Sequence, residues 1–165
     1  MNLFKMAGTA SLVVLSSGFT LAAQTTAPSD FKLSLERQAC YGFCPMYVVS
    51  VDSKGLVTYA GERFVKLKGT YKAQLTPSQL KRLYKALERA KLGQYKNEYK
   101  AMSVTDLPSA ILKVSGLKIN AQQRSKTIDH YFGDRSAPES LTRLENELDA
   151  LMGTRKWVGT GIYRE

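Results

Sequence analysis

Histidine, cysteine and tryptophan are scarce in this chain of 165 residues, which has one His, two Cys and one Trp. Two cysteines supply neither a four-cysteine zinc ribbon nor the several bridges of a disulfide-dense scaffold. A single histidine excludes any site that needs two imidazoles. Acidic residues are also in the minority, because 14 Asp and Glu stand against 24 Lys and Arg, which gives a formal net charge of +10.

The remaining composition is that of a packed protein. Hydrophobic residues make up 44% of the chain and charged residues 23%, so the chain as a whole is not expected to be disordered. The length suits one domain better than two. We therefore expect a single domain over residues 31–165.

Residues 1–23 have the order of a secretory signal peptide. Lys5 precedes an apolar stretch over residues 6–21, and small residues close the segment at Ala22 and Ala23. Either alanine could precede the cleavage site. The alternative is an uncleaved membrane anchor, but the stretch is short and rich in Ser and Gly for a bilayer span. We expect a periplasmic or secreted protein that has a flexible leader at residues 24–30 and no transmembrane segment after cleavage.

Alternating and periodic patterns predict the secondary structure. Strand patterns occur over residues 31–35, 46–51, 56–61 and 63–75, and again over 109–120 and 125–131. Apolar residues recur at helical spacing in residues 77–92 and in the last part of the chain. Because strands joined by short turns pair antiparallel, the prediction is an α+β fold with a meandering antiparallel sheet of about six strands and two amphipathic helices, in the order ββββ-α-ββ-α.

Capping residues predict where both helices begin and end. Thr76, followed by Pro77 and Gln79, forms a capping box for the first helix, and Gly93 is the expected end. For the second helix we expect a start at Ser136, with Glu139 completing another capping box, and an end at Gly153.

Cys40 and Cys44 form the most distinctive local feature. In an extended strand their Cα atoms would lie ~13 Å apart, whereas a disulfide requires less than ~7 Å. The segment must therefore turn if the bridge forms, and Gly42 permits such a turn. A bridge closing so short a loop would stabilise the fold by about 2 kcal/mol.

Two other uses of the cysteines stay open. Thiolates favour Cu(I), and His130 is the one imidazole that could complete a copper site. A thiol–disulfide exchange role is the second alternative, although such thiols are usually activated at a helix N-terminus. Here a strand pattern, not a helix, follows the motif.

Four short motifs carry a resemblance to a known family: Arg37-x-x-Cys40-x-Gly42-x-Cys44-Pro45-x-Tyr47, Gly55-x-Val57-x-Tyr59-x-Gly61, Thr105-Asp106-x-Pro108 and Ala137-Pro138. On these motifs, residues 31–158 resemble an exported bacterial domain catalogued as a domain of unknown function, the 6438 family. The resemblance implies export and a small domain. It implies no catalytic or binding residues.

Candidate ligand-binding residues lie around the cysteine turn. Arg37, Tyr41 and Tyr47 flank or occupy the turn, and Asp106 precedes a Leu-Pro pair. The alternative is that these residues pack and hydrogen-bond around the turn. No Gly-x-Ser-x-Gly or Ser-x-x-Lys motif offers a nucleophile to His130, so we expect no enzyme, no resident cofactor and no metal.

The positive charge is uneven along the chain. Residues 62–100 contain 11 Lys and Arg against 3 Asp and Glu. Lys81, Arg82, Lys85 and Arg89 share one face of the first predicted helix and form a candidate polyanion face, the alternative being a solvated helix surface. No nucleic-acid motif accompanies them, and export separates the protein from cytosolic nucleic acid. The expected partners are anionic envelope components or an envelope protein.

The leading hypothesis from the sequence is therefore a secreted or periplasmic, non-catalytic accessory or binding domain with a local Cys40–Cys44 disulfide. The alternative is a periplasmic copper-binding or thiol-redox protein that uses Cys40, Cys44 and His130.

Overall fold

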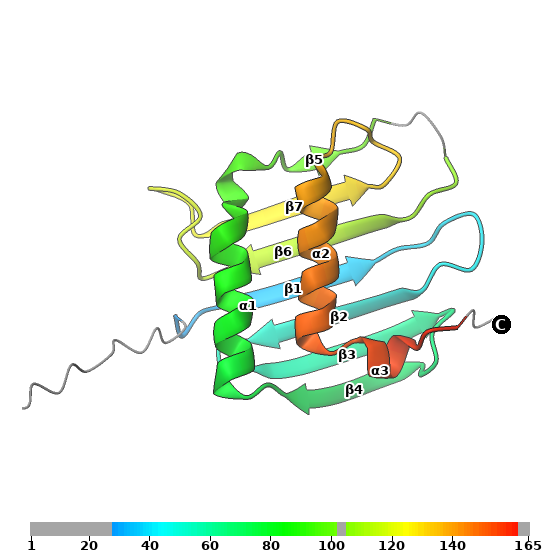
Figure 1. The fold of residues 1–165 in the computed structure, drawn as a ribbon, viewed down its shortest axis with the longest axis horizontal. Helices are drawn as coiled ribbons and strands as arrows, with labels where there is room; N and C mark the ends of the chain where they lie inside the picture. Colours follow the sequence, from blue (N-terminus) through cyan, green and yellow to red (C-terminus); the bar gives the residue numbers. More distant parts are fainter. Residues whose placement is uncertain (1–27, 102–104, 162–165) are drawn as a thin grey trace, which may run out of the picture.

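The computed structural model describes residues 28–101 and 105–161 as two layers, a seven-stranded sheet and a layer of helices on one of its faces (Figure 1). The expected signal peptide lies outside the described residues. The elements in chain order are β1 (Lys32–Arg37), β2 (Met46–Asp52), β3 (Leu56–Arg63), β4 (Gly69–Gln74), α1 (Pro77–Ala90), η1 (Leu92–Gln94), β5 (Glu98–Tyr99), β6 (Ser109–Ser115), β7 (Ser125–Tyr131), α2 (Glu139–Met152) and α3 (Arg155–Val158).

The sheet confirms the predicted α+β class, with a topology that differs from a simple meander. The strand order is β4-β3-β2-β1-β6-β7-β5, and every pairing is antiparallel except that of β5 with β7. Only β1 to β4 form a meander. Helix α1 then carries the chain across the helix layer, so that β6 pairs with the free side of β1 (Figure 1). Strand β5 is only two residues long and was not predicted.

The start of α1 is as predicted, and the other helix ends require two corrections. Thr76 and Gln79 form the capping box, but the helix ends at Lys91, whose φ is 48°, and Gly93 lies in η1. Helix α2 begins at Glu139 after Pro138, without a side-chain cap. The helix therefore does not start at Ser136. This residue lies in a turn before α2, where its N–H donates to the Asp134 carboxylate at 2.8 Å.

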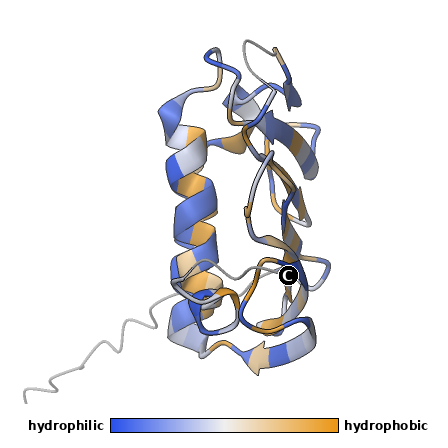
Figure 2. Ribbon diagram, turned by 90° about the vertical axis from the view of Figure 1, so that its right-hand side faces the viewer, coloured by the Kyte–Doolittle hydropathy of each residue, from blue (hydrophilic) through white to orange (hydrophobic). Residues whose placement is uncertain are grey.

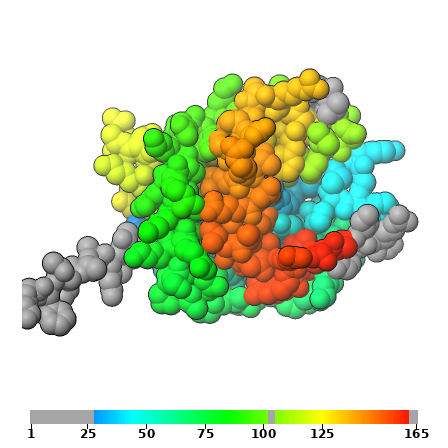
Figure 3. All heavy atoms as spheres, in the orientation of Figure 1, coloured from blue at the N-terminus to red at the C-terminus, as the bar shows by residue number. Residues whose placement is uncertain are grey.

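The core fills the space between the two layers, where the apolar residues of both face each other (Figure 2). One face of each helix packs against the inward side chains of the strands, and none of the described helices covers the other face of the sheet. In the space-filling view, α1 and α2 lie side by side over the sheet (Figure 3). None of the described helices is long and apolar enough to cross a membrane.

Gly61, the last residue of the Gly-x-Val-x-Tyr-x-Gly motif, lies where a side chain would not fit. A Cβ there would clash with the Tyr59 side chain and with the carbonyl of Leu67. The Tyr59 ring is fully buried and stacks on Trp157 of α3 with ring centroids 5.0 Å apart. The Leu67 N–H also donates to the Trp157 carbonyl at 2.9 Å. Gly61 thus lets the chain after β3 pack closely on the C-terminal helix.

Candidate ligand pocket beside the disulfide turn

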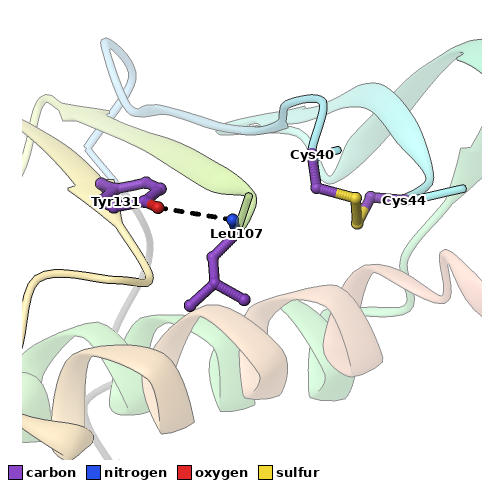
Figure 4. Close-up of a disulfide and its surroundings, with 4 residues drawn as sticks. All are labelled: Cys40, Cys44, Leu107 and Tyr131. Carbon is purple, nitrogen blue, oxygen red and sulfur yellow. Dashed lines mark hydrogen bonds between the residues drawn. A yellow bond between two sulfur atoms is a disulfide. The ribbon is translucent and has the colours of Figure 1, made fainter. Parts of the chain in front are cut away.

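The disulfide turn lies between β1 and β2, at the end of the sheet. Cys40 and Cys44 are bridged, with Cα atoms 5.7 Å apart, which confirms the predicted disulfide. The Tyr41 N–H donates to the Asp106 carbonyl at 3.1 Å and ties the turn to the loop before β6. Figure 4 shows Leu107 of this loop beside the bridge, with its backbone N–H donating to the Tyr131 hydroxyl at 3.4 Å.

The register of the sheet brings three polar side chains into one row next to this turn. His130 pairs with Ala110, Ala110 with Arg37, and Arg37 with Tyr47, across β7, β6, β1 and β2. Because side chains at paired positions point to the same face, all three polar groups face the helix layer. Ala110 contributes only a methyl group and leaves space between His130 and Arg37.

Helix α2 lies over this row and supplies its acidic partners. Glu145 and Asp149 are four residues apart and therefore share one face of the helix. The Glu145 carboxylate, fully buried, contacts His130 Nδ1 at 3.0 Å and Arg37 Nη1 at 3.5 Å. Asp149 Oδ2 accepts from Arg37 Nη2 at 2.8 Å and from Arg37 Nε at 3.0 Å.

Tyr47 completes the arrangement by donating from its hydroxyl to Asp149 Oδ1 at 2.9 Å. We call Arg37, Tyr47, His130, Glu145 and Asp149 the charge network. Its members connect in the order His130, Glu145, Arg37, Asp149, Tyr47, and they link three strands to one helix. The network therefore fixes α2 on the sheet by directional, charge-assisted contacts in addition to apolar packing.

The charge network shifts the pKa values of two of its members. Burial by itself lowers the pKa of Arg37, but Asp149, Tyr47 and Glu145 outweigh it, so the pKa of Arg37 is raised. Burial raises the pKa of Tyr47 well above that of a free phenol, and Asp149 raises it further against the opposing effect of Arg37. Arg37 is thus a fixed cation and Tyr47 a neutral donor.

A pocket of about 260 Å³ opens between the disulfide turn and the charge network. Its walls are largely apolar, and its polar groups come from the ends of β1 and β2 and from α2. The apolar lining residues are Cys44, Pro45, Pro108, Phe132 and Val158, and the polar ones are Arg37, Gln38, Tyr47, Ser109, Asn146 and Asp149.

Two of the four predicted ligand-binding residues line this pocket, and two do not. Arg37 and Tyr47 form part of its wall through the charge network. Tyr41 points away from the protein with 92% of its surface exposed, and Asp106 contributes its backbone carbonyl to the turn. The structure brings the turn, Arg37 and Tyr47 together and leaves Tyr41 on the surface.

The acidic partners on α2 were missed at the sequence level. Glu145 lies within the apolar stripe of Leu141, Leu144 and Leu148, one residue after Leu144 and three before Leu148. An acid in that position is a sign of a buried pair, because a solvent-facing residue would fall on the opposite side of the helix. The strand alternation of His130 with the buried Ile128 is the matching sign on β7.

The four cations of the candidate polyanion face are exposed, but one of them has a partner. Arg89 Nη2 lies 2.7 Å from Glu147 Oε1 of α2, so this cation is neutralised across the helix layer. Lys81, Arg82 and Lys85 remain exposed on α1. The polyanion face stays a prediction, carried by three residues instead of four.

The described residues contain no group of three or more His, Cys, Asp and Glu side chains that could hold a metal ion. Both sulfur atoms are in the disulfide, and the described contacts of His130 Nδ1 are with the Glu145 carboxylate. With the disulfide formed, the residues that the structure describes thus supply no ligand set for the copper alternative.

A comparison with known families assigns the chain. Residues 31–152 match the family described as a domain of unknown function (DUF6438). The chain belongs to this family. The matched segment runs from the residue before β1 to the last residue of α2, so the DUF6438 domain contains the whole charge network and the disulfide turn. No curated protein matches the chain.

Proposed function

We propose that this DUF6438 chain is an exported, non-catalytic binding domain of the periplasm or the extracellular space, which takes a small ligand in the pocket beside the disulfide turn. The observation that carries the proposal is the pocket itself, whose wall includes Arg37, Tyr47 and Asp149 of the charge network. Ligand sites are typically concave and mostly apolar with a few fixed polar groups, and this pocket has that composition.

Export is supported by the disulfide and by the first 23 residues. A disulfide persists in an oxidising compartment and is rare in the cytosol. The signal-like order of residues 1–23 points to the same compartment. Sequencing the amino terminus of the protein isolated from expressing cells tests this part, and we expect the chain to begin after Ala22 or Ala23. Retention of Met1, or two free thiols in unreduced protein, would contradict export.

A binding role is favoured over catalysis by the state of the polar groups. A general base or nucleophile needs an available lone pair of suitable pKa. The Tyr47 hydroxyl instead donates to Asp149, and its raised pKa keeps it protonated. Arg37 donates to Asp149 and to Asn146 Oδ1, at 3.0 Å for the latter. These groups are positioned to recognise a ligand more readily than to exchange protons with it.

The size and lining of the pocket define the class of ligand. About 260 Å³ admits a small molecule or a single side chain of a partner. Pro45, Pro108 and Phe132 favour an apolar body, while Gln38 and Asn146 at the wall suit one hydrogen-bonding group. We therefore propose a small, mainly apolar ligand with one polar end.

Blocking the pocket tests the proposal. Asn146 is exposed on α2 and lines the pocket, so Asn146→Trp fills the pocket, and it also removes the hydrogen bond that Arg37 donates to Asn146 Oδ1. Ala150→Trp is the matched control, because Ala150 is exposed on the same helix and does not line the pocket. Ligand-observed NMR with a library of small aromatic and aliphatic fragments is the measurement.

We expect a set of fragments that binds the unsubstituted protein and Ala150→Trp but not Asn146→Trp. A library in which no fragment binds, or in which both tryptophan variants bind alike, would reject the pocket as a ligand site. Export is measured separately, so either half of the proposal can fail without the other.

A further inference from the structure

Six large hydrophobic residues are exposed in the part of the chain that the structure describes, and three of them lie at the disulfide end of the sheet. Tyr41 is 92% exposed, Phe43 48% and Leu107 42%. Tyr41 and Phe43 belong to the disulfide turn, and Leu107 follows the residue whose carbonyl binds the Tyr41 N–H. We call these three residues the aromatic tip. In Figure 3 the turn projects beyond the edge of the helix layer.

The aromatic tip is held rigidly. The disulfide closes the turn, and the Phe43 ring packs edge-on against Phe64 with centroids 5.3 Å apart. The residues therefore stay exposed without the loop collapsing onto the core. A rigid apolar projection loses little conformational entropy when it is buried by a partner.

Four exposed cations lie on the segments next to the disulfide turn. Arg63 lies over the Phe64 ring at 4.8 Å, and the Lys66 N–H donates to the carbonyl of Val158, the last residue of α3. Arg155 and Lys156 are exposed on that helix. None of Arg63, Lys66, Arg155 and Lys156 forms an ion pair with an acid among the described residues, and we call these four the basic rim.

The contacts show that rim and tip share one end of the molecule. Val158 lines the same pocket as Cys44 and Pro45, so α3 lies against the disulfide turn. Among the described residues, two acids are exposed at this end, Glu62 and Asp106, against the four cations of the basic rim. The strand ends and loops concerned gather on the right-hand side of Figure 1.

We propose that this end of the protein docks on the surface of an anionic phospholipid bilayer, with the aromatic tip in the headgroup region and the basic rim against the lipid phosphates. Tyr and Phe side chains beside cations are suited to the boundary between headgroups and acyl chains. Each cation near an anionic leaflet strengthens partition roughly fivefold. The proposal rests on the proposed export only in placing the chain near such a membrane.

Vesicle sedimentation tests the docking surface. The isolated protein is mixed at low salt with sucrose-loaded vesicles of phosphatidylglycerol and phosphatidylcholine in equal parts, and with vesicles of phosphatidylcholine alone. We expect binding to the anionic vesicles that weakens as salt is raised. The double variant Tyr41→Ser/Phe43→Ser should lower the partition roughly tenfold or more. Tyr41→Ser alone should lower it less and cannot disturb the core, because this side chain is almost fully exposed.

Two control variants separate this surface from others. Leu56→Ser removes an apolar side chain with 38% exposure at the opposite end of β3 and should leave binding unchanged. The triple variant Lys81→Ser/Arg82→Ser/Lys85→Ser removes the polyanion face of α1 and should retain the dependence on the aromatic tip. Inorganic phosphate at equal ionic strength should not compete, because a bilayer offers an extended surface instead of one phosphate site.

Four results would overturn the proposal. These are no sedimentation of the unsubstituted protein at low salt, an equal loss for Leu56→Ser, full loss in the α1 variant with normal binding of the tip variants, and specific displacement by inorganic phosphate. The protein could also fail to bind vesicles and yet bind an envelope protein only when Tyr41 is intact. That result would assign the aromatic tip to a protein partner and would also reject the lipid proposal.

Discussion

The space between the sheet and the helices is apolar under α1 and charged under α2. Under α1, the buried side chains of Leu83, Tyr84 and Leu87 pack in the hydrophobic core, with Tyr84 edge-on to Phe31 at 4.6 Å. Under α2, the charge network replaces part of that packing. The helix layer is therefore held on the sheet by two kinds of interaction. Apolar burial under α1 is non-directional, whereas the paired charges under α2 require specific partners.

Removing the central acid of the charge network should have the largest effect. Glu145→Ala leaves His130 without its described carboxylate partner and leaves Arg37 with Asp149 as its one described acidic partner. Breaking a buried pair from one side costs about 3–5 kcal/mol of the free energy of unfolding. Urea denaturation measures this loss. Glu145→Gln keeps the shape and some hydrogen bonds and should cost less. A loss below about 1 kcal/mol for the alanine variant would show that the network contributes little to stability.

Truncation in the apolar half should cost almost as much by a different mechanism. Leu83→Ala removes a fully buried side chain of α1 and should lower the free energy of unfolding by about 3 kcal/mol through lost burial and the cavity left behind. Because no charge is involved, the loss should be the same at low and high salt. A strong dependence on salt would mean that the two halves are not separable as described.

Two Tyr→Phe substitutions compare the region under α1 with the region under α2, because each removes a single hydroxyl oxygen. Tyr47→Phe removes the donor to Asp149 and should cost about 2 kcal/mol. The buried Tyr84 hydroxyl has no hydrogen-bond partner among the described residues, so Tyr84→Phe should be neutral or slightly stabilising. Equal costs for the two variants in the same denaturation assay would argue against a directional role for Asp149.

Raising the pH into the alkaline range should have the smallest effect, because no stability is lost by this route at neutral pH. Burial raises the pKa of Tyr84 from 10.0 to about 12, with Asp52 adding to the shift, and burial and Asp149 raise that of Tyr47 further. The unfolded chain therefore releases these protons at a lower pH than the folded chain. Their contribution to stability is complete below pH 10 and is lost as the pH rises through the folded pKa values.

Phenolate absorbance followed together with near-ultraviolet circular dichroism measures this titration. We expect Tyr84 and Tyr47 to ionise only as the fold is lost, with Tyr47 last. If all nine tyrosines ionised in one step near pH 10 with the fold intact, the raised values would be wrong.

Local patterns were sufficient to predict most of the fold. The alternation of Leu33 and Leu35, the Thr76 capping box and the leucine stripe of α2 each depend on neighbours in the chain. The pairing of β6 with β1 joins residues far apart in the sequence and has no local signature. Strand β5 has only two residues, which is too short to show the alternation of apolar and polar residues that predicts a strand. The start of α2 was misplaced because the Asp134 carboxylate competes for the Ser136 N–H.

The candidate site was predicted only in part, because some of its residues are close together in the sequence and others are not. Arg37 and Tyr47 were found because they flank the cysteine turn in the sequence. Their partner Asp149 lies on the last long helix, and only the sheet register together with the position of α2 brings the three residues together. An amphipathic helix places its acids in solvent by default, so the burial of Glu145 could not be inferred from the charge of the helix alone.

The position of β1 in the sheet has a consequence for how the chain is made. This central strand pairs on one side with β2, which follows it directly, and on the other with β6, which emerges from the ribosome much later. The acids that neutralise Arg37 arrive later still, on α2. A chain that ended before α2 would lack Glu145 and Asp149, the acids that Arg37 contacts, so the charge network cannot form until the last long helix is in place.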